Sequence, residues 1–115
     1  MTMEANVLIH WKGLRNDEDV QIHLSDRCRE IAEEFPETQF YELSIEASHR
    51  KIQCHGHVNG KQTRVAAHAQ DLPTARQAAD LVLDKLHREL RREHDKRIFS
   101  HRRRAQRDPS KRILQ

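Results

Sequence analysis

Hydrophobic and polar positions along the chain follow two periods, and the change of period marks the boundaries of the predicted elements. In residues 5–12 the apolar side chains Val7, Ile9 and Trp11 alternate with other residues, which predicts a first strand. Apolar residues then recur three or four positions apart, as on one face of a helix. The members of that face are Val20, Leu24, Cys28, Ile31 and Phe35. Pro36 ends this first helix.

Three further segments alternate with a period of two and predict three successive antiparallel strands. Their apolar positions are Tyr41, Leu43, Ile45 and Ala47, then Ile52, Cys54, Gly56 and Val58, then Thr63, Val65, Ala67 and Ala69. We expect His49 and Arg50 at the first turn between these strands. Asn59-Gly60 is a strong short hairpin signal, so we expect the second turn at that pair.

A second helix is predicted after the strands, with Asp71 and Pro73 marking its start. Its apolar stripe consists of Ala75, Ala79, Val82, Leu83, Leu86 and Leu90. The apolar pattern stops beyond Ile98. We therefore expect one folded domain in residues 1–98, followed by a flexible, arginine-rich basic tail in residues 99–115.

The order of the elements is β-α-β-β-β-α, which predicts an α+β fold. A four-stranded sheet with one apolar face needs a cover, and two amphipathic helices on that face supply it, giving a two-layer sandwich. The other face of the sheet is too polar to be a second core. Its side chains are Glu42, Glu46, Gln53, His55, His57, Arg64 and His68.

Composition narrows the classes of function. Apolar residues make up 36% of the chain and charged residues 34%, and no apolar run approaches the ~20 residues that cross a bilayer. We therefore expect no membrane segment and no secretory signal in the first ten residues. Cys28 and Cys54 form no CxxC pair, which argues against a disulfide framework or a zinc knuckle. This cysteine usage favours a reducing, cytoplasmic compartment.

Residues that could carry catalysis or bind a metal are poorly placed. No serine lies in a nucleophile-elbow motif, and three glycines cannot build a phosphate-binding loop, so we expect no enzyme, no cofactor and no small-molecule substrate. His55, His57 and His68 share the polar face of the sheet and could in principle hold zinc. No carboxylate or cysteine stands at a characteristic spacing from them, so we expect exposed histidines and no metal.

Charge is distributed unevenly along the chain. The formal net charge is +3, but residues 85–115 hold 12 Lys/Arg and 4 Asp/Glu, or +8, whereas residues 1–84 hold 9 and 14, or −5. On the second helix the spacings 3, 4 and 4 place four cations on one ridge about 16 Å long. They are Lys85, Arg88, Arg92 and Lys96. Such a stripe is typical of a protein that binds a polyanion, and nucleic acid is the first hypothesis.

A structural explanation of the same charges remains open. Glu89, Glu93 and Asp95 interrupt the ridge and can form ion pairs within the helix, as on a solvent-exposed helix without a ligand. The basic segment could also meet an acidic protein surface, or any A-form RNA duplex, because such duplexes are recognised by shape. Protein-interaction and general double-stranded RNA-binding modules are therefore the alternatives.

Several segments resemble a known family. They are Val58-Asn-Gly60, Gln70-Asp71, and Asp84-Lys-Leu-His-Arg-Glu-Leu90 continuing through Asp95-Lys96. These residues are similar to the short form of the ribosome hibernation-promoting factor and protein Y family, also described as ribosome-associated sigma-54 modulation proteins, and the resemblance covers roughly residues 5–97. It implies a β-α-β-β-β-α fold close to the double-stranded RNA-binding topology.

The resemblance also implies a function in translation regulation and the stress response. Such proteins bind ribosomal RNA in the channel of the small subunit, occlude the messenger-RNA and transfer-RNA sites, and hold idle ribosomes inactive. The matching basic positions are Arg27, Lys85, Arg88, Arg92 and Lys96. With their neighbours Arg91 and Arg97 they are the candidate rRNA-binding residues, and Arg102, Arg103 and Arg104 are candidate RNA contacts in the tail. The isolated protein is expected to be a monomer.

Overall fold

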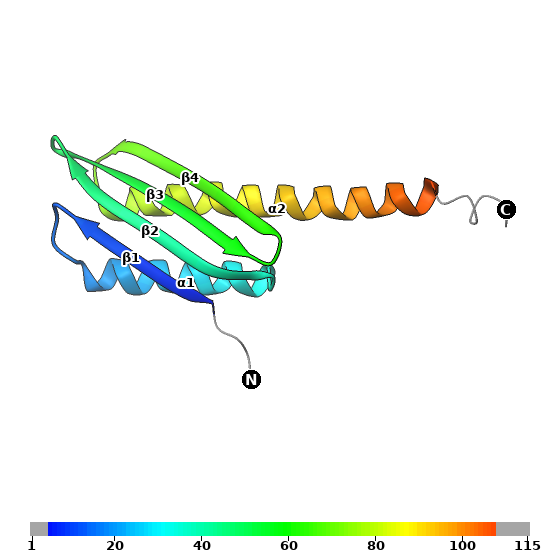
Figure 1. Cartoon of the computed structure of the whole chain (residues 1–115). Coiled ribbons are helices and arrows are strands. Elements are labelled where there is room, and N and C mark those ends of the chain that lie inside the picture. The colour runs from blue at the N-terminus through cyan, green and yellow to red at the C-terminus, as the bar shows by residue number, and fades with distance from the viewer. Residues whose placement is uncertain (1–4, 108–115) are drawn as a thin grey trace.

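The computed structural model describes residues 5–107, with side chains described for residues 5–100. The elements are β1 (Asn6–Lys12), α1 (Glu18–Glu34), β2 (Thr38–Ser48), β3 (Lys51–Gly60), β4 (Thr63–Leu72) and α2 (Ala75–Arg107). This is the predicted β-α-β-β-β-α order, and the α+β class is confirmed. Both helices cover one face of a four-stranded sheet (Figure 1).

The strands lie side by side in chain order, β1-β2-β3-β4. The pair β1–β2 is parallel, with α1 as its crossover connection, and the other two pairs are antiparallel. α2 packs mainly on β3 and β4, whereas α1 packs on β1 and β2 and contacts α2. The two helices therefore form one layer and the sheet the other, and the second sheet face is left uncovered (Figure 1).

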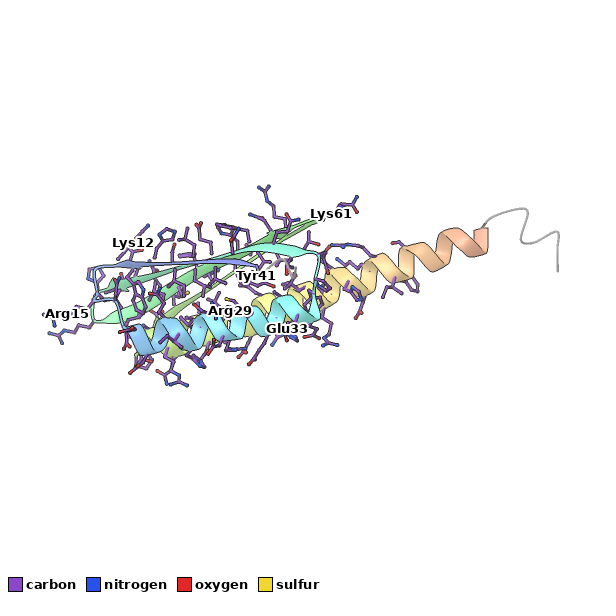
Figure 2. All side chains as sticks on the ribbon, turned by 90° about the horizontal axis from the view of Figure 1, so that it is seen from below. Lys12, Arg15, Arg29, Glu33, Tyr41 and Lys61 are labelled. Carbon is purple, nitrogen blue, oxygen red and sulfur yellow. The ribbon has the colours of Figure 1, made fainter. Side chains whose placement is uncertain are left out.

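The core lies between these layers, and the predicted apolar faces form it. Its largest fully buried side chains are Tyr41, Leu43, Ile45 and Val58 from the sheet, Leu24 from α1, and Val82, Leu83, Leu86 and Leu90 from α2. Tyr41 lies between the sheet and α1 (Figure 2), where burial raises its pKa to about 12 and its hydroxyl is 2.8 Å from the hydroxyl of Thr38. Ala47, expected on the inner face, is exposed because it lies near the end of β2.

The turn between β3 and β4 is not where the sequence predicted it. Asn59 and Gly60 belong to β3, and the turn consists of Lys61 and Gln62, the latter with φ of 62°. Gly60 is required for a different reason. A Cβ atom there would lie 2.2 Å from the carbonyl oxygen of Glu37, so the glycine allows the chain before β2 to pass directly against β3. The expected turn at His49 and Arg50 is confirmed, with φ of 49° and 69°.

The start of the second helix also differs from the prediction. Asp71 lies within β4, with φ of 65°, and α2 begins at Ala75. The hydroxyl of Thr74 accepts a hydrogen bond of 3.1 Å from the backbone N–H of Gln77, which satisfies one free donor at the helix start. Thr74 is therefore the capping residue.

The second helix is longer than predicted. It continues to Arg107 and extends past the end of the sheet (Figure 1), so the backbone of residues 99–107, expected to lie in the tail, is helical. The apolar stripe stops because there is no sheet beneath this part, not because the helix ends. No glycine or proline occurs between Thr74 and Asp108, and arginine, glutamine and alanine favour helix. The remainder of the predicted tail, residues 108–115, lies outside the described residues.

Candidate nucleic-acid interface

Three basic side chains on the exposed side of α2 are free or weakly paired. Arg88, Arg92 and Lys96 stand four residues apart, on one line about 12 Å long at ~1.5 Å per residue. Among the described residues, Arg88 has no hydrogen bond or ion pair. Arg92 lies 3.5 Å from Glu89, and Lys96 lies 3.8 Å from Glu93. Both pairs are solvent-exposed and contribute little, so all three cations remain available to an external anion.

Lys85, the first member of the predicted ridge, is bound within the protein. Its Nζ donates a hydrogen bond of 2.8 Å to the backbone carbonyl of His68 in β4. The carbonyl lies on the edge strand of the sheet, where such groups lack a strand partner. Lys85 thus links α2 to the sheet.

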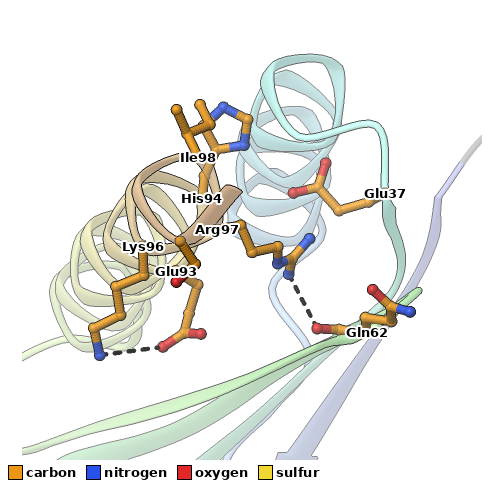
Figure 3. Close-up of a pocket in the computed structure, with 8 residues that line it drawn as sticks. Glu37, Gln62, Glu93, His94, Lys96, Arg97 and Ile98 are labelled. Carbon is orange, nitrogen blue, oxygen red and sulfur yellow. Dashed lines mark hydrogen bonds and ion pairs between the residues drawn. The ribbon is translucent and has the colours of Figure 1, made fainter. Parts of the chain in front are cut away.

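Arg97 has a similar role at the other end of the sheet. It donates a hydrogen bond of 3.0 Å to the carbonyl of Gln62 in the β3–β4 turn (Figure 3), and a second to the hydroxyl of Thr63. These contacts border an open pocket of about 670 Å³, whose lining includes Glu37, Glu93 and Lys96. Because its lining holds two carboxylates, Glu37 and Glu93, and two cations, Lys96 and Arg97, the pocket has no excess of either charge.

Arg27 faces α2 rather than solvent. Its guanidinium lies 3.0 Å from the carboxylate of Asp80 and 2.9 Å from that of Asp84, and it also donates to the backbone carbonyl of Asp80. Burial alone would lower the pKa of Arg27, but these hydrogen bonds and the charges of the two carboxylates raise it overall. His23 lies 2.9 Å from Asp80 in the same cluster. Arg27 therefore joins the two helices.

A second ionic cluster lies further along the same helix pair. Glu34 of α1 accepts hydrogen bonds from His87, at 2.6 Å, and from Arg91. The hydrogen bond of His87 and the positive charges of His87 and Arg91 outweigh desolvation and lower the pKa of Glu34. Between the two clusters lies an open groove of about 500 Å³, with Arg88 at its border. The groove has mixed charge, so it differs from a purely basic phosphate-binding cleft.

The first helix adds negative charge to this side of the molecule. Within α1 the acids are Glu18, Asp19, Asp26, Glu30, Glu33 and Glu34, against the bases Arg27 and Arg29, so the helix carries 2 − 6 = −4. Figure 2 shows Arg29 and Glu33 along the outer side of α1. Since phosphate is repelled by such a surface, α1 does not extend the basic ridge of α2.

The predicted site residues therefore fall into three groups. Arg88, Arg92 and Lys96 form the exposed ridge, whereas Arg27, Lys85, Arg91 and Arg97 bind within the protein. Arg102, Arg103 and Arg104 lie in the extension of α2, where only the backbone is described. The two interhelix clusters were not predicted from the sequence. Their local signal is a spacing of four residues, which His23 and Arg27, Asp80 and Asp84, and His87 and Arg91 all share, so that each pair lies on one face of its helix.

Among residues 5–100, the histidines and cysteines have no arrangement suited to a metal or a nucleophile. His55 and His68 stack on the uncovered sheet face with ring centroids 5.7 Å apart, and within the described residues no group of three His, Cys, Asp or Glu side chains could hold an ion. Cys28 and Cys54 are both fully buried, and desolvation raises each pKa to about 12. Their thiols are thus core side chains that are protonated at neutral pH.

Comparison with known proteins identifies the class of protein. The sequence profile of the family described as Sigma 54 modulation protein / S30EA ribosomal protein matches residues 7–98. The chain belongs to this family, which confirms the resemblance found in the sequence and supports association with the ribosome. A comparison with curated protein sequences finds no significant match. Neither helix, within the described residues, contains an apolar stretch long enough to cross a bilayer.

Two solved structures are similar in fold. A ribosomal subunit interface protein from Coxiella burnetii is 14% identical, with a TM-score of 0.66, over 76% of this chain and 98% of that one. The N-terminal domain of Protein Y from Thermus thermophilus is 14% identical, with a TM-score of 0.65, over 78% of this chain and 98% of that one. At this identity the likeness establishes the shared fold.

Proposed function

We propose that this protein is a translation inhibitor that binds the small ribosomal subunit and keeps idle ribosomes inactive. In this proposal the exposed side of α2 contacts ribosomal RNA in the channel that messenger RNA and transfer RNA use. Inhibition is then steric: the bound protein occupies the path of these ligands and performs no chemistry. Its site of action is the cytoplasm, and the free protein is monomeric.

The observation that carries the proposal is the line of available cations at Arg88, Arg92 and Lys96. A polyanion is their natural ligand, because each phosphate contact releases condensed counterions. The sequence adds positive charge beyond this line, since residues 98–107 contain four arginines and no acid. Family membership supports ribosomal RNA as the particular polyanion.

The remaining predicted residues have two further roles in this proposal. Arg102, Arg103 and Arg104 lengthen the basic surface beyond the sheet. Arg27, Lys85, Arg91 and Arg97 act mainly by holding α2 against α1 and the sheet, so that the ridge is presented on a rigid helix. Preorganised side chains lose less conformational entropy on binding than side chains on a flexible tail.

Sedimentation tests this function directly. Purified protein is mixed with ribosomal subunits and with vacant ribosomes, run on a sucrose gradient at near-physiological salt, and located by immunoblot. We expect stoichiometric migration with the small subunit and with whole ribosomes, and a peak of ribosome dimers would identify a dimerising subtype. Absence from every ribosomal peak would contradict the proposal and favour a protein-interaction module.

A competition control separates ribosome binding from general RNA binding. An excess of an unrelated A-form RNA duplex is added before sedimentation. A general double-stranded RNA binder reads shape and would be displaced by the duplex. We expect the protein to stay on the ribosome, because the proposed site combines the α2 ridge with a specific shape of the channel.

A further inference from the structure

The uncovered face of the sheet carries an ordered set of side chains that the α2 site does not use. The strand registers align them in rows that cross the sheet. The rows are Asn6–Phe40–Asn59–Arg64, then Leu8–Glu42–His57–Ala66, then His10–Ser44–His55–His68. Successive rows stand about 6.6 Å apart, at ~3.3 Å per residue. This face points away from both helices (Figure 1).

Aromatic rings are concentrated in the two central strands and β4. The imidazoles of His55 and His68 stack with centroids 5.7 Å apart and planes inclined by 22°. Phe40 and His57 form a second pair, at 6.3 Å and 39°. His55 and His68 are exposed, and 41% of the His57 side chain is accessible. Flat rings at the surface of a sheet, on adjacent rows, can each stack on a different planar ligand.

The charges of this face are arranged around the rings. Lys12, Lys51 and Arg64 are exposed toward its edges, and their side chains have no hydrogen bond or ion pair among the described residues. Two of the three carboxylates of the face already have partners, and the third, Asp71, is exposed at the end of β4 in the same pocket as Lys51 and Gln53. Glu42 lies 3.8 Å from His10 and 3.9 Å from His57, and Glu46 accepts a hydrogen bond of 3.0 Å from Gln53. The formal charge is therefore 3 − 3 = 0, and three cations and one carboxylate of the face are free of ion pairs among the described residues.

We propose that this sheet face binds single-stranded RNA, with bases stacking on the His55–His68 and Phe40–His57 pairs and phosphates held by Lys12, Lys51 and Arg64. Single-stranded RNA is recognised by rings of phenylalanine, tyrosine, tryptophan or histidine on which bases stack, together with cations that follow the backbone. Asn59 and Gln53 supply amide groups that can hydrogen-bond to base edges.

A protein partner fits this face less well. The core of a stable protein interface is apolar, with aromatic side chains in dry pockets. Here the exposed apolar side chains are few, with Leu8 the largest at 43% exposure, and polar groups occupy the centre of the face. The face has no acidic excess that would attract a basic segment. A ligand that combines planar rings with negative charge matches it better.

This surface goes beyond the proposed function, since it is separate from the α2 ridge and needs no ribosome. The test uses the whole chain, labelled with ¹⁵N and ¹³C, and an oligouridylate about ten nucleotides long, within the range of known single-strand sites. Resonances of the histidine rings and of backbone amides are followed during titration. We expect saturable shifts at His55, His57 and His68, with intermolecular contacts between these rings and uracil.

Three variants make the assignment specific, and binding is measured by fluorescence anisotropy with the same oligonucleotide. H55A/H68A is expected to weaken binding about tenfold, because base stacking on a ring is lost. H55F/H68F retains rings without imidazole charge or hydrogen bonds, and we expect it to keep most of the affinity. H49N, which removes a histidine from the turn before β3, is the control and should bind normally, since asparagine tolerates positive φ.

The outcomes separate this proposal from the ribosome proposal. R88E/R92E should still show ring shifts with oligouridylate even if it no longer sediments with ribosomes. Shifts confined to α2, no binding at all, or equal binding by H55A/H68A and the parent would each overturn the sheet-face proposal. Binding by H55F/H68F that is as weak as binding by H55A/H68A would also overturn the proposal, because stacking would then not be the source of affinity.

Discussion

The side-chain nitrogen of Lys85 lies 2.8 Å from the backbone carbonyl oxygen of His68, so a cation of the basic helix is bonded to the edge strand of the sheet. By sequence spacing alone, Lys85 is equivalent to the three exposed cations that follow it. In the fold it stabilises the contact between α2 and β4 and protects the edge of the sheet. Position on a charged ridge therefore does not by itself assign a residue to ligand binding.

Replacing Lys85 by methionine should lower stability without removing the exposed ridge. The loss of one hydrogen bond costs about 1 kcal/mol, which urea unfolding can measure. Association with ribosomes, measured by sedimentation of the folded variant, should change less than twofold, about 0.4 kcal/mol by the relation between affinity and free energy. A large loss of ribosome binding in a stable K85M protein would show that Lys85 contacts the ligand after all.

Reversing the charge of Arg88 and Arg92 should abolish association with ribosomes. Both side chains are exposed, and Arg92 makes only a weak ion pair, so R88E/R92E should remain within about 1 kcal/mol of the parent in unfolding free energy. The readout is co-sedimentation together with a urea unfolding curve.

A matched control for this experiment is R15E/K61E. It changes the net charge by the same amount at two exposed cations, one in the loop before α1 and one in the β3–β4 turn (Figure 2). If both double variants lose binding equally, the effect is one of total charge and the α2 site is wrong. Retention of binding by R15E/K61E alone assigns the site to α2.

The Glu34 cluster predicts a specific dependence of stability on pH. Because the folded protein lowers the pKa of Glu34 from its ordinary value near 4.5, the cluster stabilises the fold above that pH and loses its effect as pH falls through the lower, folded pKa. E34Q should thus be less stable than the parent at pH 6, and the difference should shrink below about pH 4.5. Urea unfolding of both proteins across this range measures the difference in unfolding free energy. If the Glu34 contacts do not form in solution, that difference should stay the same as the pH falls.

Much of the fold follows from local sequence patterns. The spacing of Leu24, Cys28 and Ile31 fixes the buried side of α1, and the alternation of Tyr41, Leu43 and Ile45 fixes that of β2, because burial selects one period for each element. These faces were predicted correctly.

Features that depend on distant partners were not predictable in this way. Arg27 is bonded to Asp80, 53 positions away, and nothing near Arg27 in the sequence identifies that partner. The end of α2 was missed because the prediction relied on an apolar stripe, which a helix needs only where it covers a sheet. The basic ridge was predicted as four residues, and packing leaves three of them exposed.

Gly60 shows how a local signal can be assigned to the wrong cause, and it gives a direct test. Gly60 does not form the turn. It allows the backbone of Glu37 to lie directly against β3, since the carbonyl oxygen of Glu37 would be 2.2 Å from a Cβ atom added at Gly60. G60A should therefore destabilise the protein by about 2–4 kcal/mol, as forced overlap in a packed region does. The neighbouring N59A change, on the outer face, should cost much less. If G60A and N59A both lower the thermal stability by the same small amount, the close approach of Glu37 to Gly60 is contradicted.

Removal of residues 100–115 tests whether the extension of α2 belongs to the binding surface or to the folded domain. Arg97, which bonds α2 to the sheet through Gln62 and Thr63, is retained in the truncated protein, so the protein should keep its fold and most of its stability. The deletion removes six of the chain's 21 Lys/Arg residues and one of its acids. Ribosome binding should then weaken, with a smaller dependence on salt concentration, because fewer phosphates are contacted.

The salt dependence distinguishes a direct contact from an indirect one. Binding is measured at several salt concentrations for the full chain and for the truncated protein, with circular dichroism and thermal unfolding as checks of the fold. Weaker binding with an unchanged salt slope would mean that the extension acts sterically and makes no phosphate contacts. Unfolding of the truncated protein would instead mean that the extension packs against the domain and supports the core beneath α2.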